Sequence, residues 1–180
     1  MAYLDSDFFA RDTLAVARDL IGAVLVVGEC EGRIVEVEAY KDDAASHAVT
    51  RRHKARTMFN TFGHVYVYFI YGMYYCLNFT TESEAAGAVL IRAAEPLRGL
   101  EVMSERRGTR DTKKLASGPA RLAQAFGIDL SFNGKPVGKA VKLKPRAITP
   151  EISAGTRIGI SKARELEWRF FEKDSPFVSK

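Results

Sequence analysis

The chain has 180 residues, 47% of them hydrophobic and 27% charged, which is the composition of a globular protein that can bury a sizeable core in one domain. Its formal net charge of +5 permits a nucleic-acid partner without requiring one. The longest apolar run is too short to span a bilayer, we expect no signal peptide, and two cysteines do not make a disulfide framework, so we expect a reduced cytosolic protein.

The start of the chain predicts a helix followed by a pair of strands. Apolar side chains recur at helical spacing over residues 6–21, and Ser6 or Asp7 can cap the first turn. Two apolar segments, residues 23–27 and 33–40, flank a glycine-containing turn and predict a β-hairpin.

The second strand of this hairpin carries two acids on one face. Alternation along a strand places every second side chain on the same side of the sheet. The residues on this face are Ile34, Glu36, Glu38 and Tyr40. Two acids and a tyrosine on one face are either solvated or line a cleft, and the spacing alone does not choose between the two carboxylates.

A polar connection with little periodicity follows at residues 41–62. Within it, residues 51–56 carry four formal positive charges, of which Arg51 and Arg52 are the first two. A basic run of this size is either a solvated loop or a surface that contacts phosphate groups.

An aromatic segment, residues 64–80, holds five of the seven tyrosines. Its β-branched and aromatic residues predict strands over 65–70 and 73–79, with a tight turn at Tyr71-Gly72 because glycine accepts a positive φ without steric cost. The pair is either a core hairpin or a surface hairpin whose tip tyrosine can wedge into a partner.

The rest of the chain predicts further strands and two helices. A strand over residues 87–93 is interrupted by Arg92, which is unusual unless the arginine is paired or reaches a cleft. Residues 96–107 form a predicted helix with Leu97, Leu100 and Met103 facing inward, and Ser117 caps a second helix. The last third predicts three short strands, at residues 141–143, 157–160 and 168–171.

Because strands outnumber helices and hairpins dominate, we expect an α+β fold. It forms a single domain over residues 1–180, around a curved, mostly antiparallel sheet with flanking helices and a protruding β-hairpin. The sequence has no glycine-rich phosphate loop, no dinucleotide fingerprint and no CxxC or HxxxH pair, so we expect neither a cofactor nor a metal. The chemistry left is that of carboxylate, tyrosine, histidine and arginine side chains on or beside adjacent strands.

Several motifs follow one another in the order found in a known family. They are Val-Glu-Val-Glu-Ala-Tyr at 35–40, Ala-Ser-His at 45–47, Tyr-Val-Tyr-Phe-Ile-Tyr-Gly-Met at 66–73, Asn78, Val-Leu-Ile-Arg-Ala-Ala-Glu-Pro at 89–96 and Ser-Gly-Pro-Ala-Arg-Leu at 117–122. Over nearly its whole length the chain resembles a bacterial member of the alkyladenine (3-methyladenine, 3-methylpurine) DNA glycosylases. The resemblance implies a monofunctional base-excision enzyme.

The resemblance implies that the damaged base is flipped out of the duplex, because a base inside the helix cannot be reached. Tyr71 matches the family's intercalating wedge, and Met73 after it would press on a neighbouring base pair. Arg51 and Arg52 are the expected basic DNA contacts. The expected partner is double-stranded DNA with damaged purines, bound by a monomer in the cytoplasm at the nucleoid, without a membrane.

The resemblance also implies a pocket for the flipped base. Tyr40, His47 and Tyr68 match its stacking walls, and aromatic walls suit a purine that alkylation has made cationic. Asn78 matches the position that crowds the exocyclic amino group of normal guanine. We expect alkylated purines as substrates, with deaminated purines as a further class.

Two residues match the family's machinery for bond cleavage. Glu38 matches the general base that accepts a proton from the attacking water, and Arg92 matches the residue that positions this water and touches the lesion phosphate. No matching position supplies a lysine nucleophile, so we expect hydrolysis that leaves an uncut abasic site for base excision repair.

Two other functions fit the same residues. A non-catalytic module could sense distorted duplexes with the basic loops and the hairpin, although it would not need a carboxylate such as Glu38. A nucleoside hydrolase would need the pocket but neither the Tyr71 wedge nor the basic surfaces, and its substrate binding would depend weakly on salt.

Overall fold

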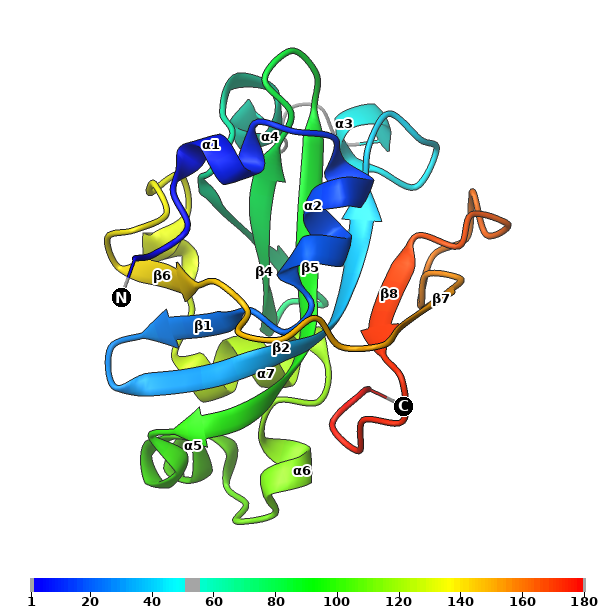
Figure 1. Cartoon of the computed structure of the whole chain (residues 1–180). Helices are drawn as coiled ribbons and strands as arrows, with labels where there is room; N and C mark the ends of the chain where they lie inside the picture. Colours follow the sequence, from blue (N-terminus) through cyan, green and yellow to red (C-terminus); the bar gives the residue numbers. More distant parts are fainter. Residues whose placement is uncertain (1, 51–55, 180) are drawn as a thin grey trace.

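An antiparallel sheet of eight strands organises the part of the chain that the computed structural model describes, residues 2–50 and 56–179. The strand order along the main path is β3-β4-β5-β2-β1-β6, while β8 pairs with both β2 and β7. Figure 1 shows β2 and β5 crossing the lower part of the molecule and then turning upward, so the sheet is strongly curved. The strands are β1 (Val24–Val27), β2 (Cys30–Tyr40), β3 (Val65–Ile70), β4 (Tyr74–Thr81), β5 (Gly87–Arg98), β6 (Val141–Lys144), β7 (Ile152–Gly155) and β8 (Arg169–Glu172).

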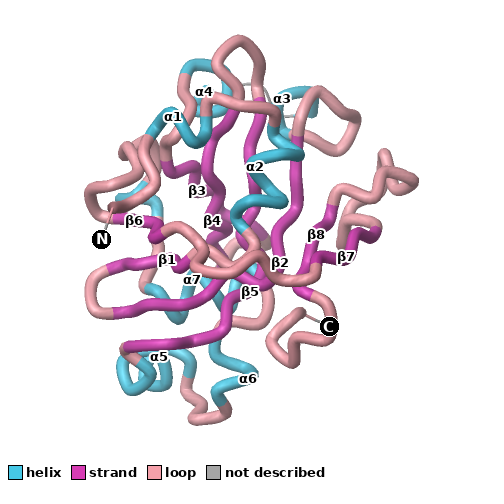
Figure 2. Tube along the Cα trace, in the orientation of Figure 1, coloured by secondary structure: helices cyan, strands magenta, loops and turns pink. Residues whose placement is uncertain are grey.

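Short helices and loops lie around this sheet, as Figure 2 shows. Helix α2 packs on β2 and β5, and α7 packs on β4 and β5. The predicted α+β class with a curved antiparallel sheet is therefore confirmed. None of the helices among the described residues is long and apolar enough to cross a membrane. They are α1 (Ser6–Phe9), α2 (Thr13–Leu20), α3 (His47–Thr50), α4 (Arg56–Asn60), α5 (Leu100–Arg107), α6 (Thr112–Leu115) and α7 (Pro119–Phe126), with a 3₁₀ turn η1 (Leu130–Phe132).

The predicted aromatic hairpin is present as β3 and β4. Their register pairs Val65 with Phe79 at one end and Ile70 with Tyr74 at the other. The turn lies where it was predicted, with φ of 51° at Tyr71 and 68° at Gly72. A turn with positive φ at both central residues matches the right-handed twist of the strands that it joins.

The N-terminal segment forms two helices, so the prediction of one helix over residues 6–21 is wrong. The Asp12 carboxylate accepts hydrogen bonds from the backbone N–H groups of Leu14 and Ala15, and thereby starts α2 as a separate helix. Asp5, rather than Ser6 or Asp7, caps α1. A second capping residue inside an apolar periodic stretch was the signal for this break.

The helix predicted over residues 96–107 begins only at Leu100, because β5 continues to Arg98. Pro96 lies in β5 opposite Gly32 of β2, and Leu97 is 47% exposed rather than inward-facing. The long pairing with β2 thus overrides the helix-start signal of the proline. A left-handed Gly99 makes the transition from strand to helix.

Three further predictions need correction. Gly118, not Ser117, is the N-cap of α7. Residues 157–160 form a loop instead of a strand. The Arg157 side chain donates to the Ala39 carbonyl and the Ile158 N–H donates to the Glu38 carboxylate, so these contacts with β2 involve side chains and are not those of a strand ladder. The connection over residues 41–62 contains α3 and α4. Arg51 and Arg52 lie outside the described residues, so their role as DNA contacts stays a prediction.

We predict that Gly87→Ala destabilises the fold. A Cβ at this position would lie 2.3 Å from Thr13 Oγ1 and 2.5 Å from Thr81 Oγ1. These hydroxyls are hydrogen-bonded to each other, and Thr13 also donates to Glu82, so they cannot move aside freely. Overpacking of this kind costs about 1–3 kcal/mol in the free energy of unfolding, measured by urea denaturation.

The control for this prediction is Gly155→Ala in β7, where the nearest atom to a new Cβ is Arg169 Nη2 at 3.4 Å. We expect this variant to unfold close to the wild-type midpoint. Equal midpoints for the two variants would show that the tight contacts at Gly87 carry no cost.

Candidate active site

Two register shifts in the pairing of β2 with β5 bring the acidic residues and Arg92 to one side of the sheet. Glu36 pairs with Ala93 and Val37 pairs with Ile91, so Arg92 is an extra residue on β5. The register also shifts between Ile34 and Glu36. Ile34 therefore joins the hydrophobic core with Val37, and the prediction that it shares a face with the acids is wrong.

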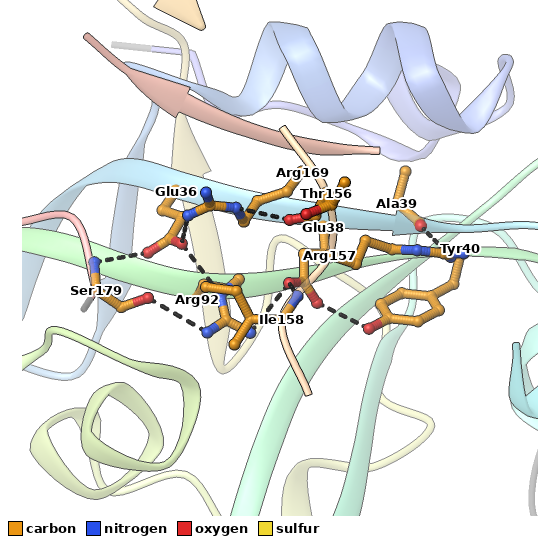
Figure 3. A network of polar contacts seen from close by, with 10 residues as sticks. All are labelled: Glu36, Glu38, Ala39, Tyr40, Arg92, Thr156, Arg157, Ile158, Arg169 and Ser179. Carbon is orange, nitrogen blue, oxygen red and sulfur yellow. Dashed lines mark hydrogen bonds and ion pairs between the residues drawn. The ribbon is translucent and has the colours of Figure 1, made fainter. Parts of the chain in front are cut away.

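Glu38 is fully buried, yet its carboxylate forms part of a cavity wall. Its Oε1 accepts a hydrogen bond from the backbone N–H of Ile158 (2.7 Å) and lies 3.1 Å from Nη1 of Arg92. The Tyr40 hydroxyl donates to Oε2 at 2.7 Å. Figure 3 shows these contacts converging on the carboxylate. A buried charge with a cation and two hydrogen-bond donors around it is held in one orientation.

Glu36 is also fully buried, but it does not line the cavity. Its Oε1 accepts from Nε of Arg92 (3.2 Å) and from Nη1 of Arg169 (3.0 Å), and its Oε2 accepts from the backbone N–H of Ser179 (2.8 Å). Arg92 in turn donates from Nη2 to Ser179 Oγ (3.3 Å). The structure thus separates the two carboxylates: Glu36 anchors the arginine, and Glu38 borders the space that a ligand can enter.

The cavity beside Glu38 has a volume of about 630 Å³, enough for a small ligand such as a purine. Strands β2 to β5 form one side, and residues 158–162 form another. Lys162, an exposed residue of that loop, also lines it. Seven of the residues predicted from the sequence line this cavity: Glu38, Arg92, Tyr40, His47, Tyr68, Asn78 and Tyr71.

Aromatic rings make up much of the cavity wall. The rings of His47 and Tyr68 lie 4.6 Å apart, and those of Tyr66 and Tyr68 lie 5.6 Å apart. His47 Nδ1 is 2.9 Å from the Tyr66 hydroxyl, which ties α3 to β3. Burial, reinforced by the neighbouring Glu38 carboxylate, raises the pKa of Tyr40 far above its usual value. The Tyr40 hydroxyl therefore keeps its proton and remains a donor.

Asn78 lies on β4, opposite Tyr66 of β3 and Leu90 of β5. Its side-chain nitrogen donates to the backbone carbonyls of Tyr66 (3.0 Å) and Cys76 (3.4 Å). The side-chain carbonyl oxygen is therefore the Asn78 atom available to a ligand in the cavity. Two backbone acceptors also keep the amide from turning around.

The tip of the hairpin carries large apolar side chains into solvent. Tyr71 is 83% exposed and Met73 is 63% exposed. Tyr71 and the preceding Ile70 also line the cavity, so the tip stands next to the cavity mouth. A tyrosine with positive φ is strained by about 1–2 kcal/mol relative to glycine, so its side chain rather than its backbone accounts for its presence at this turn.

Three groups that hold the site were not predicted from the sequence. Ile158 contributes only its backbone N–H, and no residue type predicts such a donor. Ser179 and Arg169 reach Glu36 from segments more than 130 positions away in the chain. Their pairing depends on how β8 docks on β2, which the residue pattern of either segment does not contain.

The cysteines are not arranged for catalysis or metal binding. Burial raises the pKa of the Cys76 thiol to about 11, and burial likewise raises the pKa of Cys30. Within residues 2–50 and 56–179, no group of three or more His, Cys, Asp or Glu side chains is placed to hold a metal ion. The charged chemistry at the cavity is that of Glu38 and Arg92, with Lys162 at its exposed loop.

Comparison with known proteins gives a consistent result. A family model described as "Methylpurine-DNA glycosylase (MPG)" matches residues 7–176. A relative from Methanoculleus marisnigri is 47% identical over 98% of both chains. Relatives from Rhodopseudomonas palustris and Rhizobium etli are 49% and 48% identical over 96% of this chain and 86% and 87% of their own. All three are named "Putative 3-methyladenine DNA glycosylase".

Proposed function

The chain belongs to the methylpurine-DNA glycosylase family, and from this premise we propose that it flips an alkylated purine out of duplex DNA into the cavity and removes it with a water molecule that Glu38 activates. As a member of the family it is a DNA glycosylase, a hydrolytic enzyme of DNA repair, and its substrate is DNA.

One observation carries the proposed mechanism: the Glu38 carboxylate borders an aromatic-walled cavity while Arg92 and two hydrogen-bond donors hold it. A carboxylate held in one orientation at the wall of the cavity can accept the proton of a water that lies between it and a bound nucleotide. Its negative charge also stabilises the positive charge that develops on the sugar ring.

In the proposed step, water attacks the anomeric carbon C1′ and gives its proton to Glu38. The bond between C1′ and the purine nitrogen breaks, and its electron pair leaves with the base. A purine alkylated at a ring nitrogen carries a positive charge, so it leaves as a neutral molecule. Neutral hypoxanthine would leave as an anion that takes up a proton from solvent water. The products are a free base and an abasic sugar in an uncut strand, and no lysine adduct forms.

We propose that base selection uses the aromatic wall and Asn78. Tyr40, His47 and Tyr68 would stack on the purine, and a cationic purine gains about 0.5–2 kcal/mol from such rings. The Asn78 side chain, held by two backbone contacts of its amide nitrogen, would crowd the exocyclic amino group of guanine. 7-Methylguanine keeps this group, and its positive charge would offset the crowding through stronger stacking on the aromatic wall. Hypoxanthine, a deaminated purine, lacks this group and would be accepted.

The hairpin tip supplies the proposed wedge, and Tyr71→Ala tests it. We expect this variant to bind lesion DNA about 10- to 100-fold more weakly, because stacking of an aromatic side chain on bases contributes about 1–3 kcal/mol. The fold should not lose stability, since Tyr71 has a strained backbone and its side chain is exposed to solvent at the tip of the hairpin. The readouts are the fluorescence of a reporter base next to the lesion and the urea midpoint.

Met73→Ala on the same tip is the control for this variant. Met73 would press only on a neighbouring base pair, so its loss should weaken flipping less than the loss of Tyr71. Unchanged flipping by Tyr71→Ala would remove the wedge from the mechanism.

The remaining expectations are also part of this proposal. Residues 1–180 would act as one glycosylase domain and as a monomer, in the cytoplasm at the nucleoid. Arg51 and Arg52 would contact phosphates beside the lesion. Salt dependence of DNA binding that becomes weaker in an Arg51→Ala, Arg52→Ala double variant would support this contact.

The experiment is incubation of the protein with duplexes that carry a single 7-methylguanine or hypoxanthine. We expect free base by chromatography and a strand that breaks only after alkali treatment. Borohydride should trap no protein–DNA adduct, which tests whether Lys162 of the cavity acts as a nucleophile. Release from free nucleosides but not from duplexes would favour a nucleoside hydrolase, and lesion binding without release would favour a damage-sensing module.

A further inference from the structure

Arg157 is a buried cation directly behind the candidate active site. It is 4% exposed and lies in the loop before Ile158. Its Nη1 donates to the Ala39 carbonyl (3.0 Å), and its two terminal nitrogens contact the two Asp43 oxygens at 3.1 and 2.8 Å. Its Nε has no hydrogen-bond partner among the described residues. A buried guanidinium is thus kept in place at the cost of one unsatisfied polar atom.

The guanidinium lies over two aromatic rings. Its central carbon lies 4.8 Å from the ring centroid of Tyr40 and 5.1 Å from that of Trp168. Tyr40 lines the cavity and Arg157 does not, and from this we infer that the cation covers the ring face of Tyr40 that is turned away from the cavity. Figure 3 shows Arg157 next to the Tyr40 ring, whose hydroxyl points to Glu38.

We propose that Arg157 is a positioning residue that acts through Tyr40 and sets how strongly the cavity prefers cationic over neutral bases. Both faces of an aromatic ring attract cations. When a guanidinium occupies one face, the ring attracts a cationic base on its other face less strongly. The positive charge of the guanidinium also repels that base. Neither effect acts on a neutral base, so the arrangement keeps neutral purines within the substrate range.

Asp43 sets the strength of this effect. Its carboxylate pairs with Arg157 and balances part of the positive charge behind Tyr40. The side chain of Asp43 also accepts hydrogen bonds from the backbone N–H groups of Lys41 and Ala45, so it orders the turn that leads to His47. The charge behind the ring can therefore be changed in both directions, by replacing either the cation or its acidic partner.

This inference rests on the proposed function, because it needs a purine stacked on Tyr40. The test measures single-turnover efficiency on two duplexes that differ only in the lesion, cationic 7-methylguanine or neutral hypoxanthine. The readout is the ratio of the two efficiencies, since a purely structural loss lowers both. Three variants form a charge series with the wild type: Asp43→Asn, Arg157→Lys and Arg157→Met.

We expect the ratio of 7-methylguanine to hypoxanthine release to rise about two- to tenfold in Arg157→Met, which removes the cation. It should fall in Asp43→Asn, which leaves the cation unbalanced. Arg157→Lys disturbs the bidentate contact with Asp43 but keeps the positive charge, so the ratio of 7-methylguanine to hypoxanthine release should stay near the wild-type value.

Three outcomes would overturn the inference. One is a ratio that does not change across the series while wild type releases both bases. Another is an equal change in Arg157→Lys and Arg157→Met, which would assign the effect to geometry. If Arg157→Met does not fold, an unchanged ratio in Asp43→Asn overturns it as well. Failure of wild type to release either base would instead overturn the proposed function, and this inference with it.

Discussion

Replacement of Glu38 by glutamine is expected to lower the single-turnover rate of base release by about 10²- to 10⁴-fold, while the affinity for lesion DNA stays nearly unchanged. The amide keeps the size of the side chain, its oxygen can still accept from the Ile158 N–H, and its NH2 group can donate to the Tyr40 hydroxyl oxygen. It cannot take a proton from water, and it offers no negative charge to the sugar. Rapid-quench kinetics and a binding titration on the same duplex separate the two effects.

Glu36→Gln is the matched control, because it makes the same chemical change two residues away on the same strand. Glu36 does not line the cavity, so its loss acts through the anchoring of Arg92. We expect lower stability and a much smaller loss of base release than in Glu38→Gln. A Glu38→Gln enzyme that releases base at a near-normal rate, or a Glu36→Gln enzyme that fails equally, would remove the special role of Glu38.

Replacement of Arg92 by methionine is expected to cost about 3–5 kcal/mol in the free energy of unfolding, measured by urea denaturation at neutral pH. The change removes the cation beside the buried Glu38 carboxylate, and it leaves the buried Glu36 carboxylate with the partly exposed Arg169. A buried charge that has lost its partner is penalised by the full cost of its desolvation. Methionine fills a similar volume, so the loss reports the charge rather than a cavity.

Arg169→Met provides the comparison for this prediction. Arg169 also contacts Glu36, at 3.0 Å, but it is partly exposed and its removal leaves Arg92 in place. We expect a clearly smaller loss of stability than for Arg92→Met. If both variants unfold at the same urea concentration as the wild type, the ion-pair network does not stabilise the fold in the way that its geometry indicates.

The aromatic hairpin was predictable because its information is local. β-Branched and aromatic residues in β3 and β4, with Tyr71-Gly72 between them, specify two strands and a turn within 17 residues. The start of α5 was not predictable in the same way. Pro96 is a helix-start signal on its own, yet pairing with Gly32, more than 60 residues earlier, keeps it in a strand. Contacts between distant segments outweigh local preference there.

The candidate site likewise combines features that local sequence predicts with features that depend on contacts between distant segments. Glu38, Tyr40 and Arg92 could be singled out from their motifs, but the difference between Glu36 and Glu38 depends on two register shifts and on which carboxylate meets the cavity. The Ile158 N–H carries no residue signature, and Arg157 gave no sequence signal because it lies in a segment that was predicted to be a strand. Such features come from the docking of the last third of the chain against β2.

The position of the damaged base in a complex with DNA shows whether the base is flipped into the cavity. The measurement is a crystal structure of the Glu38→Gln variant with a duplex that contains one 7-methylguanine. We expect the purine inside the cavity against Tyr40 and His47, with Tyr71 in the space that the purine left. A lesion stacked inside the duplex, with the cavity unfilled and the hairpin tip away from the DNA, would contradict it.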